Sequence, residues 1–116
     1  MIIFKDFTFE AAHRLPLVSE DHKCFKLHGH SFHVRISIEG EVNKMGWVMD
    51  FGDVKLICNP IIQLLDHAYL NEIVGLENPT SENTAIWVWT KIKAVLPNLI
   101  SVEIRETCNS GCVYSG

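Results

Sequence analysis

Three histidines occupy positions from which their side chains could bind one metal ion. His28 and His30 are two residues apart, so in a strand they point to the same face, which Phe32 continues as an apolar face. His13 ends the apolar alternation of an earlier segment in the same way. Buried imidazoles need partners for their ring nitrogens, and a metal ion satisfies them well. Three histidines without a clear fourth ligand are typical of a catalytic zinc site, in which water or substrate takes the open position.

Two other interpretations of these histidines stay open on the residues alone. The three side chains could be ordinary core histidines that are hydrogen-bonded to neighbours. They could also bind a structural zinc ion, for which His22 or Cys24 would be the nearby fourth ligand. A His-x-His pair joined by a third histidine on the same face favours a metal site over ordinary core histidines.

Glu106 carries a carboxylate and is expected on the same strand face as apolar core residues. It shares the parity of Ile100, Val102 and Ile104 in the last alternating segment. A carboxylate on a buried face is costly unless it is paired. Either the strand has ended and Glu106 is exposed, or its two oxygens receive a flat ligand with adjacent N–H donors.

Cys24 and the pair Asp66–His67 supply further groups that move protons. Lys23 and Lys26 lie close to Cys24, and neighbouring cations or a zinc ion would favour its thiolate form. A cysteine, a histidine and a carboxylate suffice for proton shuttling. However, Asp–His pairs are common in loops, and a cysteine before a strand is often simply buried. The residues alone therefore assign these groups no role.

The elements that position these groups follow from hydrophobic periodicity. Alternation predicts strands over residues 4–13, 28–39, 47–50 and 100–108, with a final short strand after Gly111. Spacing of three and four residues predicts helices over 54–65, where Pro60 should kink or restart the helix, and over 82–96, where Ser81 is the expected N-cap. Strands and helices are segregated along the chain, which predicts an α+β fold with an antiparallel sheet.

Composition limits the class of protein. The 116 residues fit one domain, 1–116, and 47% of them are hydrophobic, so we expect some apolar surface to be covered by other subunits. The longest apolar run is five residues (85–89), against the roughly 20 that a membrane span requires. A net charge of -4 lacks the overall excess of basic residues that is typical of nucleic-acid-binding proteins. The N-terminus lacks a secretory pattern, so the four cysteines are expected to be cytoplasmic thiols.

Several motifs in order resemble one family. They are His13, Cys24-x-x-x-His28-Gly29-His30, Leu65-Asp66-His67, Pro79-Thr80-Ser81-Glu82-Asn83 and Glu106-Thr107. Together they resemble the 6-pyruvoyltetrahydropterin synthase superfamily over nearly the whole chain. The cysteine–histidine spacing and the ending Glu106-Thr107-Cys108 to Gly111-Cys112 are most similar to its bacterial branch, the 6-carboxy-5,6,7,8-tetrahydropterin synthases of queuosine biosynthesis.

The resemblance implies a fold, an assembly and a set of roles. The fold would be the tunnelling fold, an antiparallel sheet of four main strands with two helices on one side. Three such subunits would close into a β-barrel, and two trimers would stack into a homohexamer. The implied zinc ligands are His13, His28 and His30, and Cys24 would be the base, with Asp66 and His67 as its relay pair. Glu106 would anchor the pterin, helped by Thr80 and Ser81.

The implied reaction is that of a zinc-dependent lyase acting on a small pterin triphosphate. It converts 7,8-dihydroneopterin triphosphate and water into 6-carboxy-5,6,7,8-tetrahydropterin, acetaldehyde and triphosphate. One alternative is the elimination of triphosphate to give 6-pyruvoyltetrahydropterin on the same scaffold. Another is a non-catalytic, zinc-stabilised oligomeric binding module. Arg14, Lys23 and Lys26 are candidate contacts for the triphosphate, without a pattern that selects among them.

Overall fold

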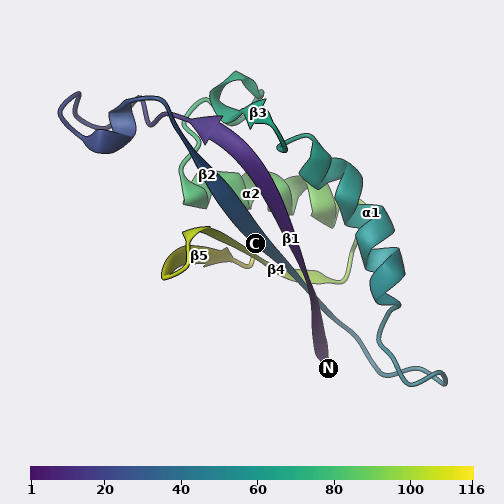
Figure 1. The fold of residues 1–116 in the computed structure, drawn as a ribbon. Helices are drawn as coiled ribbons and strands as arrows, with labels where there is room; N and C mark the ends of the chain where they lie inside the picture. The colour runs from purple at the N-terminus through teal and green to yellow at the C-terminus, as the bar shows by residue number, and fades with distance from the viewer.

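The computed structural model describes residues 1–116, which form one sheet with two helices on one of its faces (Figure 1). The elements in chain order are β1 (Ile2–His13), η1 (Lys23–Phe25), β2 (His28–Glu39), α1 (Phe51–Gln63), β3 (Ala68–Tyr69), η2 (Leu70–Glu72), α2 (Ser81–Lys93), β4 (Leu99–Thr107) and β5 (Ser110–Tyr114). The predicted α+β class is confirmed. Neither helix has the length and hydropathy that a bilayer span would require.

The sheet has five strands in the order β3-β1-β2-β4-β5, one more than the four main strands that the family resemblance implies. The additional strand is β3, a two-residue strand inside the predicted loop after α1, and it pairs with β1 in parallel. The sheet is therefore mixed, although all its long pairings are antiparallel. Hydrophobic alternation cannot reveal a strand of two residues.

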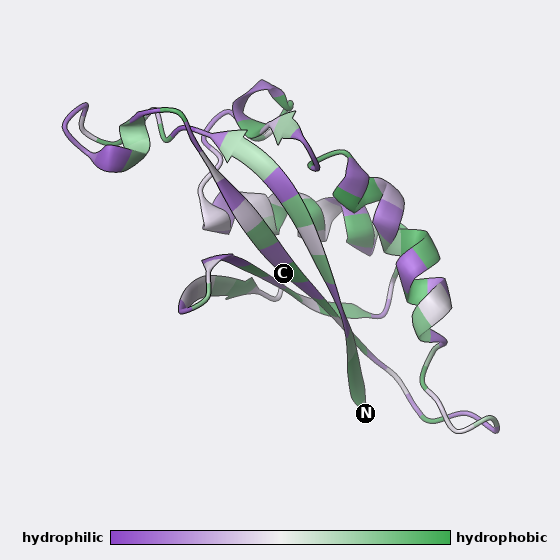
Figure 2. Cartoon of the chain, in the orientation of Figure 1, coloured by the Kyte–Doolittle hydropathy of each residue, from purple (hydrophilic) through white to green (hydrophobic).

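The long ribbon of β1 and β2 has one apolar and one polar face. Phe9 and Phe32 are register partners that stack with ring centroids 4.8 Å apart, and both are fully buried under the helices. On the opposite face Arg35 binds Asp6 through two hydrogen bonds of 2.7 and 2.9 Å. Figure 2 shows the resulting alternation of hydropathy along both strands. The predicted faces of these strands are confirmed.

Both helices begin with a side-chain cap, and neither begins as expected. Residues 47–50 form no strand; Asp50 instead accepts a hydrogen bond from the Gly52 N–H at 2.7 Å and starts α1, which continues through Pro60. Thr80, and not Ser81, caps α2, because its hydroxyl accepts from the Asn83 N–H at 3.1 Å. The side chain of Ser81 is thereby left for another contact.

The start of β4 departs from simple alternation. The register with β2 shifts, so that Leu99 pairs with Ile38 while Ser101 pairs with Ser37. Leu99 is therefore buried and Ile100 only half-buried, the reverse of the expected order. Beyond this irregularity Val102 and Ile104 lie in the core as predicted. Glu106 lies near His30, although the pairing of β4 with β5 shifts between Arg105 and Thr107.

Candidate functional site

The three histidines come together at one end of the β1–β2 ribbon. His13 ends β1 and His28 begins β2, and the two are register partners. His30 lies two residues further along β2, and one nitrogen from each ring lies within 4.8 Å of the others. The rings of His13 and His30 both meet the Phe32 ring edge-on, at centroid distances of 5.4 Å. The triad therefore rests on the core and could hold a metal ion.

His13 is the buried member of the triad. Only 1% of its surface is exposed, and its Nδ1 donates a hydrogen bond to the Pro79 carbonyl oxygen at 2.8 Å. Its Nε2 is buried without any hydrogen-bond partner. Burial is the largest influence on this ring and lowers the pKa of His13, although the Pro79 carbonyl opposes this effect. A neutral ring with an unsatisfied buried nitrogen is what a metal ligand requires.

His28 repeats this arrangement at the mouth of the site. Its Nδ1 donates to the Lys26 carbonyl oxygen at 2.7 Å, so its Nε2 carries the free lone pair. Two of the three rings are thus oriented by backbone carbonyls, the partners that commonly fix the tautomer of metal-binding histidines. Three imidazole donors suit zinc, and the orphaned Nε2 of His13 fits such an ion.

Glu106 lies beside the triad, near the end of β4. Its Oε2 is 3.7 Å from the His30 Nε2, and its Oε1 accepts a hydrogen bond from the Ser81 hydroxyl at 2.7 Å. A pocket of about 370 Å³ opens next to this carboxylate and is also lined by Leu15, Thr80 and Ser81. The structure therefore brings the three expected pterin-binding residues to one pocket next to the histidines.

Asp66 and His67 form the expected pair, but at another place on the sheet. Asp66 accepts from the Glu10 N–H at 2.9 Å through Oδ1, and its Oδ2 is 3.0 Å from the His67 Nδ1. The Glu10 N–H, followed by His67, lowers the pKa of the Asp66 carboxyl. His67 has a left-handed backbone with φ of 56°, and its side chain is 80% exposed.

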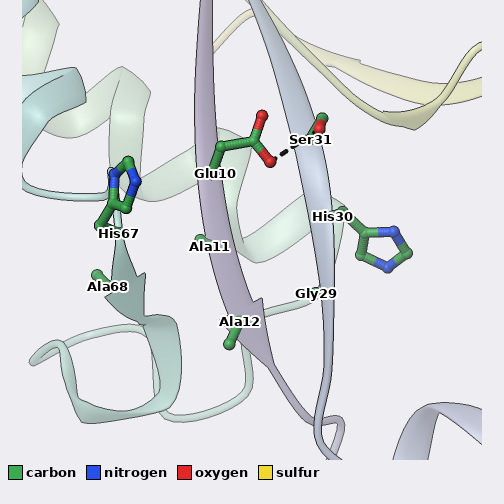
Figure 3. Close-up of a pocket in the computed structure, with 8 residues that line it drawn as sticks. All are labelled: Glu10, Ala11, Ala12, Gly29, His30, Ser31, His67 and Ala68. Carbon is green, nitrogen blue, oxygen red and sulfur yellow. Dashed lines mark hydrogen bonds between the residues drawn. The ribbon is translucent and has the colours of Figure 1, made fainter.

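The His67 side chain lines an open hollow with Glu10 and Ser31, residues of the polar sheet face. Figure 3 shows His67 on the side of β1 that faces away from β2, with the ring of His30 pointing in the other direction. Within one chain the His67 side chain therefore faces solvent, and His30 lines the same hollow with its ring turned the other way.

Cys24 lies on η1, in the loop that joins the two strand ends bearing the triad (Figure 1). Its thiol is free and half-buried. The Leu15 N–H donates to the Cys24 carbonyl oxygen at 2.8 Å, and the Cys24 N–H donates to the His22 Nδ1 at 3.1 Å. The Nδ1 of His22 is thereby engaged with the backbone of its own loop, and the group of side chains that could hold a metal ion consists of the three histidines.

Comparison with known proteins identifies the family. The family model described as 6-pyruvoyl tetrahydropterin synthase matches residues 2–116. The chain belongs to this family. Among its relatives, the 6-carboxy-5,6,7,8-tetrahydropterin synthase of Synechocystis is 46% identical, over 97% of this chain and 92% of the relative. The dihydroneopterin monophosphate aldolase of Pyrococcus furiosus is 36% identical, over 83% of this chain and 78% of the relative.

Solved structures of the pterin synthase family share the fold. The 6-pyruvoyl tetrahydropterin synthase of Caenorhabditis elegans superposes with a TM-score of 0.90 at 29% identity, covering 100% of this chain and 95% of that one. The expected tunnelling fold of the single chain is thereby confirmed.

Some contacts of this pterin synthase family site carry no sequence signal. The backbone carbonyl groups of Pro79 and Lys26 orient two of the histidines. Every residue type has such a carbonyl group, so the sequence does not single out these two. Cys112, which the sequence offers only as the end of a family motif without a role, lines the pocket beside Glu106. Burial raises the pKa of the Cys112 thiol, followed by the charge of Glu82. Only pairing of β5 with β4 brings Cys112 to this position.

Proposed function

We propose that the chain is a zinc-dependent 6-carboxy-5,6,7,8-tetrahydropterin synthase. It takes 7,8-dihydroneopterin triphosphate and water to 6-carboxy-5,6,7,8-tetrahydropterin, acetaldehyde and triphosphate, a lyase step towards queuosine. The observation that carries the proposal is the buried Nε2 of His13, which lacks a partner within a triad of imidazoles beside an acidic pocket. The similarity to the Synechocystis synthase supports the choice of reaction.

His13, His28 and His30 are the proposed zinc ligands. When bound, zinc would act as a Lewis acid towards the oxygens of the substrate side chain, which makes the adjacent C–H bonds more acidic. The chain prepares these ligands before any ion arrives. The Pro79 and Lys26 carbonyl oxygens hold two rings in the tautomer that leaves Nε2 free, and burial keeps His13 neutral.

Glu106 is the proposed anchor of the pterin ring. The amino and amide N–H groups at the edge of a pterin form a pair of adjacent donors, which a carboxylate receives with both oxygens. The Ser81 hydroxyl fixes one of these oxygens from the first turn of α2, and the pocket next to it has room for a flat ring. Thr80 lines the same pocket while its hydroxyl caps the helix.

Cys24 is the proposed base, and the Asp66–His67 pair is its companion in moving protons. Cys24 lies in the loop between the two triad-bearing strand ends, whereas His67 faces solvent from the opposite side of β1. A complete site therefore takes its histidine triad from one chain and its relay pair from another. This division makes an oligomer part of the mechanism.

The shape of one chain supports such an assembly. Its radius of gyration is 15.1 Å, larger than the roughly 13 Å of a compact chain of this length. Large apolar side chains stay exposed along the strands, including Ile2, Phe4 and Val113. We propose that three chains join their sheets into a barrel and that two trimers stack into a homohexamer, which would cover this surface.

Product analysis tests the proposed reaction. The purified protein is incubated with 7,8-dihydroneopterin triphosphate, and the products are identified by mass spectrometry together with the zinc content of the same sample. We expect 6-carboxytetrahydropterin, one equivalent of acetaldehyde, and zinc near one per chain. A product that retains the side chain, without acetaldehyde, would assign the pyruvoyl reaction, the activity named for the C. elegans structure.

Two further outcomes of this experiment would contradict the proposal. A reaction confined to dihydroneopterin monophosphate would assign the activity named for the P. furiosus relative. Zinc that is bound without any turnover would favour a non-catalytic binding module.

A further inference from the structure

We infer that Arg14 and Phe25 are positioning residues that hold Cys24 in place within the loop that joins the two strand ends bearing the triad, an inference that rests on the proposed role of Cys24. The guanidinium carbon of Arg14 lies 4.5 Å from the centroid of the Phe25 ring. Arg14 follows His13 directly, and Phe25 follows Cys24 directly. The contact thus joins the residue next to a proposed metal ligand to the residue next to the proposed base.

The stack is the interaction that the structure gives to the Arg14 side chain. Its Nε is buried without a hydrogen-bond partner, and none of the four ion pairs of the chain involves Arg14. A guanidinium over an aromatic face is attracted by the negative charge of the ring face, and more strongly where water is excluded. Phe25 is therefore the side chain with which the structure pairs the Arg14 guanidinium.

The loop that carries Cys24 has little else to hold it. No residue of η1 is buried, so the segment has no anchor in the core. Figure 1 shows this dark-blue segment at the tip of the β1–β2 ribbon, away from the helices. The backbone hydrogen bond between Leu15 and Cys24, 2.8 Å long, is the neighbouring cross-loop contact. Together the two contacts extend the pairing of His13 with His28 into the loop.

The backbone of Arg14 is itself fixed from the other side. The side-chain oxygen of Asn71 accepts from the Arg14 N–H at 3.0 Å, and its amide nitrogen donates to the Arg14 carbonyl oxygen at 2.8 Å. The same nitrogen donates to the Glu77 carbonyl oxygen at 3.3 Å. Arg14 therefore projects from a rigid base, and a guanidinium on a rigid base can restrain the Phe25 ring and the thiol beside it.

A direct contact of Arg14 with the substrate triphosphate is the rival role, and kinetics separate the two. A residue that binds phosphate raises affinity for the substrate, so its loss raises KM. Loss of a residue that places the base lowers kcat while KM stays unchanged, because binding does not depend on where the thiol lies. The reactivity of Cys24 reports the placement without any need for turnover.

The test compares Arg14→Met and Phe25→Leu with the conservative variants Arg14→Lys and Phe25→Tyr. Cys24 alkylation by iodoacetamide is timed by peptide mass spectrometry, with the exposed Cys108 of the same sample as reference. In the first two variants we expect Cys24 to react at least about threefold faster, because the half-buried thiol is released, and kcat to fall about tenfold with KM within about twofold. In the two conservative variants the Cys24 alkylation rate and kcat should lie close to their wild-type values. Zinc content and Tm should be the same in all four variants as in wild type.

Two outcomes would overturn the inference. One is Cys24 alkylation and kcat at wild-type values in both Arg14→Met and Phe25→Leu. The other is a raised KM with unchanged kcat in Arg14→Met alone, which would make Arg14 a phosphate ligand. If the wild-type protein fails to turn over the pterin triphosphate, the proposed function falls, while the alkylation rates still decide whether Arg14 and Phe25 hold the thiol.

Discussion

The hydroxyl of Ser81 donates a hydrogen bond of 2.7 Å to Oε1 of Glu106, across the gap between α2 and β4. Because Thr80 takes the capping role, the Ser81 side chain is free to point at the carboxylate. The other oxygen of Glu106 lies 3.7 Å from the His30 Nε2. Glu106 is thus held between the start of a helix and a proposed metal ligand, which fixes the direction in which it can receive a substrate.

The first prediction separates the roles of two adjacent hydroxyl groups. Ser81→Ala should weaken pterin binding by about tenfold, because the Glu106 carboxylate loses the hydroxyl that fixes its direction. Tm should fall by less than in Thr80→Ala, because the partly exposed Glu106 carboxylate can regain a hydrogen bond from water. Thr80→Ala removes the cap, so it should lower stability by about 1 kcal/mol and Tm by about 4 °C. Pterin fluorescence titration and thermal unfolding measure both effects. A larger loss of Tm in Ser81→Ala than in Thr80→Ala would contradict this division.

The second prediction concerns the carboxylate itself. Glu106→Gln replaces one acceptor with a donor that opposes the N–H groups of the pterin edge, so affinity for neopterin should fall by about 10- to 100-fold. Glu103→Gln is the matched control, because Glu103 lies on the same strand with the opposite parity and pairs with Arg105 at 3.2 Å. Neopterin binding should be normal in the control. Equal affinity in both variants would remove Glu106 from recognition.

The third prediction tests the metal ligands. His28→Ala should reduce bound zinc from about one per chain to under about a tenth, since the removal of one of three ligands leaves an inadequate set. His28 is half-buried, so the folding cost should be smaller than for the buried His13. His33→Ala is the control, because His33 is exposed on the opposite face of the same strand. Undiminished zinc in His28→Ala, measured by plasma mass spectrometry, would reject the assignment.

The histidine triad and Glu106 were predictable because parity alone decides the face of a long strand. The prediction for Glu106 holds although the pairing of β4 with β2 shifts near Leu99 and its pairing with β5 shifts between Arg105 and Thr107. The starts of the helices were less predictable. Thr80 and Ser81 are both good N-caps, and only the tertiary contact with Glu106 distinguishes the two.

Other parts of the site depend on contacts that no local pattern encodes. The Pro79 carbonyl reaches His13 across 66 positions of sequence, and every residue type offers a carbonyl. The position of Asp66 follows from its hydrogen bond with the Glu10 N–H, which only the parallel pairing of β3 with β1 creates. The motifs could therefore name Asp66 and His67 without placing them, whereas the structure puts the His67 ring on the side of β1 that faces away from β2.

The fourth prediction follows from the ion pair on the polar sheet face. The hydrogen bond from Arg35 holds the pKa of the Asp6 carboxyl below its usual 3.8. A carboxyl whose pKa is lower in the folded protein stabilises the fold fully at a pH above about 4, and this contribution is lost as the pH falls through the folded pKa. In metal-free protein the loss of Tm between about pH 5 and 2.5 should therefore be smaller in Asp6→Asn than in wild type. Identical acid profiles would show that the pair contributes no stability.

The last prediction concerns the site between chains. If the triad and Cys24 belong to one chain and His67 to its neighbour, Cys24→Ala and His67→Ala should each be inactive alone yet complement each other. Some sites of a mixed oligomer then receive Cys24 from one variant and His67 from the other. Random assembly of equal amounts gives about a quarter of the sites both intact residues, so co-expressed chains should recover about a quarter of the wild-type activity. A chain with both substitutions, co-expressed with either single variant, is the control and should restore none. No recovery in the mixture of single variants would mean that each chain supplies its own relay pair.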